Sequence, residues 1–207
     1  MGWSVTRTSA PTVEPITRQE AIKFLRVEHS DDDWLIDMEI AAAREIVEQE
    51  TGRQLTEATW VLYADGFPSL DNSRPAIFCD GGFILPHSPL RSVTSIYYVD
   101  TNGNSLEFSN TKYVIHTSLE PGRVYLAYGQ SWPSTRQKEA AVTITYKAGY
   151  GTTAASVPAR IRGLMLSLVH LMYENRTPTI GLHGISEPIL QTMRSLADGW
   201  NWMGRTD

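Results

Sequence analysis

The chain has 207 residues, of which 42% are hydrophobic and 20% are charged, a composition that suits one globular domain or one domain with a smaller lobe. The formal net charge is −5 and Lys and Arg form no basic block, which argues against a protein that grips the phosphates of duplex DNA. No apolar run approaches the ~20 residues of a membrane-spanning helix, and residues 4–12 lack the apolar core of a secretion signal, so we expect neither membrane insertion nor export. The single cysteine, Cys79, excludes an internal disulfide.

The first predicted helix begins at Thr17. The pattern Thr17-Arg18-Gln19-Glu20 allows the Thr17 side chain to cap the helix and the Glu20 side chain to return a hydrogen bond to the Thr17 amide. The acidic run 31–33 follows a break and precedes a second helix, which suits a helix N-terminus. It lacks the spaced acids, central glycine and closing glutamate of an EF-hand, so we interpret it as capping rather than as a calcium site.

The second predicted helix runs from about Trp34 to Thr51 and ends at Gly52. Its apolar residues gather on one side, and three charged residues take the other. These charged residues are Asp37, Arg44 and Glu48. The pattern predicts one buried face and one solvated face.

A series of short strands is predicted between Glu57 and Tyr146. Their residues are β-branched and aromatic, and Pro and Gly end them at short intervals. The segments are 59–63, 76–79, 83–85, 93–99, 105–108, 113–115, 123–127 and 141–146. Short strands with such punctuation favour an antiparallel sheet or a small barrel over βαβ units.

Two further helices are predicted towards the C-terminus. The third begins at Pro158, carries apolar residues at helical spacing and stops at 175–178; the fourth runs from about Glu187 to Trp200. An aromatic tail follows, with Trp200, Trp202 and Met203. Such side chains are costly to expose, and they either dock on a partner chain or pack back onto the chain's own helices.

Together these elements predict an α+β fold. Helices from the N- and C-terminal parts form a helical bundle, and the antiparallel β module is an insertion between them. We place the boundaries, in chain order, at an N-terminal arm 1–15, a helical body 16–56, the β module 57–147, the second part of the helical body 148–200 and a C-terminal tail 201–207.

The chain shows no clear catalytic or metal-binding motif, and we expect no enzyme activity and no cofactor. Cys79 with His87 or His116 would be the only nucleophile and base pair to consider, but no nucleophile signature surrounds Cys79. The five histidines are scattered without metal-ligand spacing. A cysteine hydrolase is therefore the weakest alternative.

A ligand- or carbohydrate-binding β module is a second alternative. It would use exposed aromatic side chains, of which Trp60, Tyr97, Tyr98 and Trp132 are the candidates. Adjacent residues of a strand point to opposite faces, so Tyr97 and Tyr98 do not form one platform, which weakens this interpretation.

Several segments, in register along most of the chain, resemble the head-to-tail connector proteins of tailed phages. The most distinctive are Pro89-Leu90-Arg91-Ser92-Val93, which matches the family's central strand entry, and Tyr128-Gly129-Gln130-Ser131-Trp132-Pro133, which matches a later loop. The other matching segments are 15–21, 25–27, 31–33, 40–44, 51–53, 85–86, 147–151, 157–158 and 173–176. The resemblance covers roughly 15 to 176, and the tail after Thr177 matches poorly.

The resemblance implies an adaptor with no active site, metal or cofactor. Such proteins form a ring of about twelve copies below the portal of a phage or phage-like gene transfer particle and extend the DNA channel towards the tail. The implied partners are the portal protein, other copies of the chain, and a stopper or tail-terminator protein. DNA passes through without sequence-specific binding. The implied location is the virion neck, between head and tail, after synthesis in the host cytoplasm.

Two sets of site residues are expected from this role. By analogy, Trp200, Trp202 and Met203 are portal-docking anchors, because aromatic side chains buried in partner pockets carry much of an interface's energy. Asp37 and Glu48 are expected to face the channel, where an acidic wall repels DNA phosphates and lets the duplex slide. The alternative interpretation of these two acids is a solvated helix face.

Overall fold

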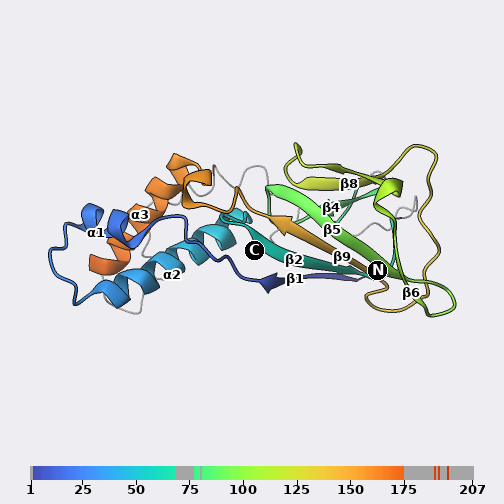
Figure 1. The fold of residues 1–207 in the computed structure, drawn as a ribbon, viewed down its shortest axis with the longest axis horizontal. Helices are drawn as coiled ribbons and strands as arrows, with labels where there is room; N and C mark the ends of the chain where they lie inside the picture. The colour runs from blue at the N-terminus through green and yellow to red at the C-terminus, as the bar shows by residue number, and fades with distance from the viewer. Residues whose placement is uncertain are drawn as a thin grey trace. The chain divides into compact units, whose positions relative to one another are not determined.

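The computed structural model describes residues 2–68, 77–79 and 81–174, together with Ile189, Gln191 and Ser195. Within these residues the fold is α+β, as predicted (Figure 1). The described residues form three α-helices and two antiparallel sheets, where the sequence predicted one antiparallel sheet or a small barrel. Contacts divide the described chain into two compact units. Among the described residues, the β unit comprises those within 2–10 and 57–149, and the helical unit comprises 11–56 and 150–174 with Ile189, Gln191 and Ser195.

The larger sheet of the β unit has five strands in the order β1-β2-β9-β5-β6, and every neighbouring pair is antiparallel. In chain order the strands are β1 (Trp3–Ser9), β2 (Ala58–Ala64), β5 (Leu90–Val99), β6 (Ser105–Glu107) and β9 (Val142–Ala148). Four of these strands coincide with predicted segments. Strand β1 was not predicted, because its residues are mostly polar and exposed and so give no apolar alternation.

The smaller sheet has four strands in the order β3-β4-β8-β7. The strands are β3 (Phe78–Cys79), β4 (Gly82–Leu85), β7 (Tyr113–His116) and β8 (Gly122–Leu126). Both sheets contribute to one core, for example Ile144 of β9 and Phe83 of β4. The absence of a Cβ at Gly122 lets β8 lie directly against the Leu90 side chain of β5, which brings the two sheets together.

The loop that leads from β8 to β9 is held down by Trp132. The Trp132 ring stacks on Phe67 with ring centroids 4.8 Å apart, and its Nε1 donates a hydrogen bond of 2.8 Å to the Gly81 carbonyl. Phe83 and Phe108 also contact the indole, at centroid distances of 5.6 and 5.2 Å. Because the indole lies against this aromatic cluster and its N–H is satisfied, the loop after β8 is fixed to the core.

The helical unit contains α1 (Arg18–Leu25), α2 (Asp33–Thr51) and α3 (Ala159–Glu174). The predicted capping box at α1 is confirmed: the Glu20 amide donates to Thr17 Oγ1 at 3.2 Å, and the Thr17 amide donates to Glu20 Oε2 at 2.8 Å. This hydrogen bond from the Thr17 amide lowers the pKa of Glu20 below its ordinary value. Helix α2 ends at Gly52, as predicted, and the φ of 62° at this residue is the left-handed conformation that glycine commonly adopts after a helix.

The three helices share one apolar core. Helix α1 contributes Ala21, α2 contributes residues such as Ile36 and Ile40, and α3 contributes residues such as Met165 and Leu168. Most of the predicted fourth helix, 187–200, lies outside the described residues. The helical bundle as a whole therefore stays a prediction, whereas the packing of α1, α2 and α3 on a common core is observed.

We expect Thr17→Ala to lower the free energy of unfolding by about 1 kcal/mol, because it removes the side-chain acceptor that caps α1. Thr17→Ser is the matched control and keeps the hydroxyl, so its stability is expected to stay close to that of the parent. Urea unfolding followed by circular dichroism measures both variants. Equal losses in the two variants would contradict a capping role for the hydroxyl.

Candidate functional site

The outer side of α2 exposes two large apolar side chains. Trp34 is 67% exposed and Met38 is 56% exposed. They are four residues apart and therefore lie on the same side of the helix, opposite Ile36 and Ile40, which are buried in the core of the helical unit. We call Trp34 and Met38 the outer face of α2. Two large apolar side chains exposed one turn apart make this face a candidate surface for contact with another molecule.

The predicted channel-facing residue Asp37 lies at the side of α2 and is paired with Arg18 of α1. Arg18 Nε donates to Asp37 Oδ1 at 2.7 Å, and Arg18 also contacts Asp33 at 3.1 Å. The hydrogen bond to Asp37 raises the pKa of the Arg18 guanidinium. Both side chains of the Arg18–Asp37 pair are 45% exposed. Asp37 is thus open to solvent, but Arg18 compensates its charge.

The second predicted residue, Glu48, is only 10% exposed and accepts several hydrogen bonds. Its carboxylate pairs with Arg44 Nη1 at 3.1 Å and accepts from Gln54 Nε2 at 2.5 Å and from the Leu55 amide at 3.1 Å. It therefore holds the segment that follows α2 against the helix.

The prediction that Arg44 and Glu48 lie on a solvated face of α2 is wrong. Arg44 is 8% exposed, and its Nε also pairs with Glu14 at 2.9 Å. Burial alone would lower the pKa of Arg44, but Glu48 and Glu14 raise it above its ordinary value. The helical pattern of α2 could not show this, because the covering residues come from segments before and after the helix. That Asp37 and Glu48 face a channel is a separate prediction, and the structure of one chain does not test it.

The predicted portal anchors Trp200, Trp202 and Met203 lie outside the described residues. The structure adds Trp34 and Met38 as candidate interaction residues, which the sequence analysis did not single out. The sequence does contain the information needed to find them. Successive residues of an α-helix are rotated by about 100° around its axis, and this rotation places Trp34 and Met38 opposite the apolar residues on the core side of α2.

The candidate catalytic residues do not form a nucleophile and base pair in the geometry described. Cys79 is partly buried and its Sγ lies 3.4 Å from the Tyr125 hydroxyl. The His116 ring contacts the Tyr125 ring edge-on, with centroids 5.5 Å apart. His87 instead stacks on Trp60 at a centroid distance of 3.6 Å. Among the described residues, no group of three or more His, Cys, Asp or Glu is placed to hold a metal ion.

The aromatic residues considered for ligand binding are mostly used within the β unit. Trp132 stacks on Phe67, Tyr98 contacts the same ring at 5.7 Å, and Trp60 is covered by His87. Tyr97 is 42% exposed. As expected from strand alternation, Tyr97 and Tyr98 differ in environment, so these residues do not present one aromatic platform.

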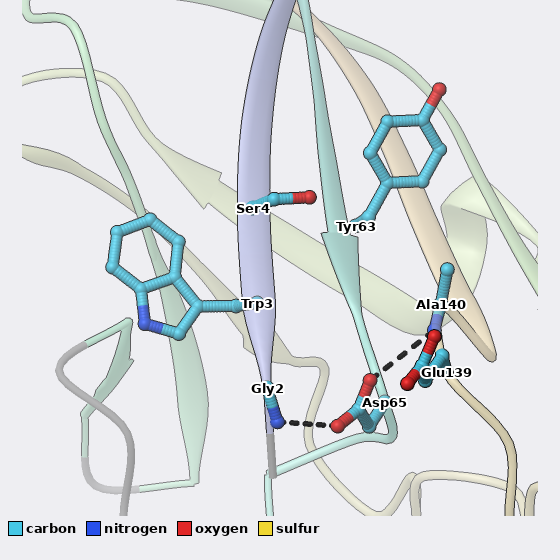
Figure 2. A pocket seen from close by; sticks show the side chains of 7 residues that line it. All are labelled: Gly2, Trp3, Ser4, Tyr63, Asp65, Glu139 and Ala140. Carbon is cyan, nitrogen blue, oxygen red and sulfur yellow. Dashed lines mark hydrogen bonds between the residues drawn. The ribbon is translucent and has the colours of Figure 1, made fainter.

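A small pocket lies where β1 begins and β2 ends, with a volume of about 290 Å³ (Figure 2). Its lining residues are Gly2, Trp3, Ser4, Tyr63, Asp65, Glu139 and Ala140. Asp65 accepts hydrogen bonds from the Gly2 amide and, at 3.2 Å, from the Ala140 amide. The rings of Trp3 and Tyr63 point away from each other (Figure 2). Asp65 thus fastens β1 and the segment before β9 to the end of β2, which is a structural role.

In the part of the chain that the structure describes, no helix combines the length and the apolar composition that crossing a membrane requires.

Neither a protein-family model nor a curated protein matches this sequence. The fold, however, is similar to that of chains in solved structures of gene transfer agent (GTA) particles. A chain in the neck of an empty GTA particle, computed with C6 symmetry, is 18% identical with a TM-score of 0.74. A chain in the virion of the native GTA particle is 17% identical with a TM-score of 0.72, and one in the native neck, computed with C12 symmetry, is 16% identical with a TM-score of 0.66.

Each of these matches covers 93% of this chain and 94% of the other. The likeness therefore extends over both units rather than over one of them. At these identities it establishes a shared fold.

We expect Glu48→Ala to lower the free energy of unfolding by about 2 to 3 kcal/mol, because Arg44 loses a buried partner and the Leu55 amide loses its acceptor. Glu14 still pairs with Arg44, which limits the loss. Glu45→Ala is the control: Glu45 is 63% exposed, and its change is expected to stay within about 0.5 kcal/mol. A Glu48→Ala effect no larger than that of Glu45→Ala would contradict this assignment.

Stability is also expected to depend on His87. Burial, assisted by Arg7, lowers the pKa of His87 to about 4, so the unfolded chain binds a proton at higher pH than the folded chain does. Stability is therefore full above pH ~6.5 and falls by about 3 kcal/mol as the pH drops to about 4.

Unfolding free energies measured between pH 7 and pH 4 in the parent and in His87→Asn test this. Asn tolerates the positive φ of 64° at this position and does not titrate. The fall in stability is expected to be smaller in the variant by about the same 3 kcal/mol. If the unfolding free energies of the parent and of His87→Asn fell equally with pH, protonation of His87 would not be the cause of the fall.

Proposed function

We propose that this chain is a structural protein of the neck of a phage-like particle, where about twelve copies form an adaptor ring between head and tail. The observation that carries the proposal is the fold likeness to chains of GTA neck structures over 93% of this chain, with a TM-score of up to 0.74. The matching connector-type segments along 15–176 support it independently, since they are read from the sequence alone.

A structural role also agrees with the chemistry of the chain. The best candidate nucleophile, Cys79, is hydrogen-bonded to Tyr125, and His87, whose pKa is lowered by burial, is stacked on Trp60. By contrast, the outer face of α2 exposes Trp34 and Met38, which suits a protein that acts by contacting others. These observations favour an assembly protein over a hydrolase or a carbohydrate-binding module.

In this proposal DNA passes through the ring without sequence-specific binding. The net charge of −5 disfavours stable binding to phosphates. Asp37 and Glu48 stay the predicted channel-facing residues. Asp37 has the greater exposure of the two, and its pairing with Arg18 makes its repulsion of phosphates weak.

The proposed partners are the portal protein above the ring and a stopper or tail-terminator protein below it. We assign the ring body to the helical segments 16–56 and 148–200, with the β module 57–147 attached to it and 201–207 as the tail. Trp200, Trp202 and Met203 are the proposed portal anchors, because large apolar side chains of a tail gain most from burial in a partner's pocket.

Deletion of 199–207 is expected to abolish attachment of the chain to portal-bearing heads, because it removes all three anchors. Heads are isolated by sedimentation and probed for the chain by immunoblotting. Deletion of 205–207 alone is the matched control and is expected to leave attachment intact. Unchanged attachment after deletion of 199–207 would contradict portal docking through these residues.

A further inference from the structure

The outer side of α3 differs in kind from that of α2. Helix α3 buries residues such as Ile161, Met165 and Leu168, and on its opposite side it exposes Gly163, with Ser167 one turn further on. The Ser167 hydroxyl donates a hydrogen bond of 3.1 Å to the Gly163 carbonyl, so it lies along the helix rather than projecting from it. We call Gly163 and Ser167 the outer face of α3. It is smooth where the outer face of α2 is bulky.

Gly163 has no evident purpose within the described chain. It lies in the middle of a 16-residue helix, where glycine is less stable than alanine. A Cβ added at Gly163 would meet no described heavy atom within 4 Å, and its φ is not in the left-handed region. Neither crowding nor backbone conformation therefore requires a glycine here. A missing side chain would let another chain approach the backbone of α3 closely at this point.

The two outer faces lie on opposite sides of a helix pair. Helices α2 and α3 run side by side within the helical unit (Figure 1) and contribute their inner sides to one core. Trp34 and Met38 therefore point away from Gly163 of the same copy. A ring whose subunits meet head to tail needs two different, complementary patches on each subunit, and this arrangement provides them.

The charges of the two helices favour an α2–α3 contact between copies over an α2–α2 contact. Helix α2 contains six acidic residues and one basic residue, a formal charge of −5, whereas α3 contains two arginines and one glutamate, a formal charge of +1. Contact between two copies of α2 would bring like charges together, which disfavours a twofold α2–α2 dimer. Contact between α2 and α3 brings together two helices of opposite formal charge.

We propose that the outer face of α2 (Trp34 and Met38) packs on the outer face of α3 (Gly163 and Ser167) of the neighbouring copy, and that this contact closes the ring. The occupant of the α2 face is thus a second copy of this chain. The inference rests on the proposed neck ring and adds to it the interface between subunits. The Trp34 indole reaches the α3 backbone because Gly163 has no side chain, and a tryptophan in such a position carries a large share of binding energy.

Cross-linking within particles tests the contact directly. In a Cys79→Ser background, Met38→Cys and Ser167→Cys are combined, and particles are treated with a short bismaleimide before denaturing electrophoresis. A ladder of linked copies is expected, because each copy offers one cysteine to each neighbour. Each single-cysteine variant is the control and gives no ladder.

The outcomes separate this inference from the function on which it rests. If the chain is present in particle necks but the double variant gives no ladder, the α2–α3 contact is wrong and the proposed function stands. If the chain is absent from particles, the proposed function is wrong, and this inference falls with it.

Two substitutions provide a second test. Gly163→Ala is expected to raise the melting temperature of the purified chain, because alanine favours the helix, and yet to reduce its incorporation into particles. Trp34→Ala is expected to leave folding unchanged and to reduce incorporation about tenfold or more. Val13→Ala removes another exposed apolar side chain of the helical unit and is expected to leave incorporation unchanged.

Normal incorporation of both Gly163→Ala and Trp34→Ala would overturn the contact. A lowered melting temperature for Gly163→Ala would also overturn it, since the glycine would then have a use within the monomer.

Discussion

Helix α2 has apolar side chains on two opposite sides, and the core of the helical unit covers only one of them. Ile36 and Ile40 are buried against α1 and α3, while Trp34 and Met38 stay in solvent. Covering a tryptophan that is two-thirds exposed and a methionine one turn away would be favourable, because it removes apolar surface from water. The account of the protein as a subunit of an assembly depends on this constraint.

Helix α2 is held in place at both of its ends by contacts within the helical unit. At its N-terminal end, Arg18 of α1 pairs with Asp37, and Tyr173 of α3 donates a hydrogen bond of 2.6 Å to Asp32. At its C-terminal end, Glu48 binds Arg44 and the segment after the helix. The outer face is therefore presented by a fixed helix, and a partner that binds it need not order it first.

Much of the fold could be predicted from the sequence, because the residues that determine it are informative locally. The capping pattern at Thr17, the glycine at Gly52 and the β-branched strands of the β unit all have their expected structures. Strand β1 could not be predicted, since its pairing with β2 depends on backbone hydrogen bonds and not on an apolar pattern.

The candidate site was less predictable. Arg44 and Glu48 have the spacing of a solvated helix face, and their burial depends on Glu14 and on the segment 54–55, which no pattern within α2 encodes. Trp34 and Met38 were available from helical spacing. A sequence does not state, however, which of two apolar sides is covered inside the chain, so the exposure of Trp34 and Met38 is known only from the packing of α2.

Electron cryo-microscopy of purified particles tests the central claim most directly. The account predicts a ring of this chain in the neck, between head and tail, with α2 of each copy against α3 of the next. Particles whose necks lack the chain, with the protein found free in the cell or on the tail surface, would contradict it.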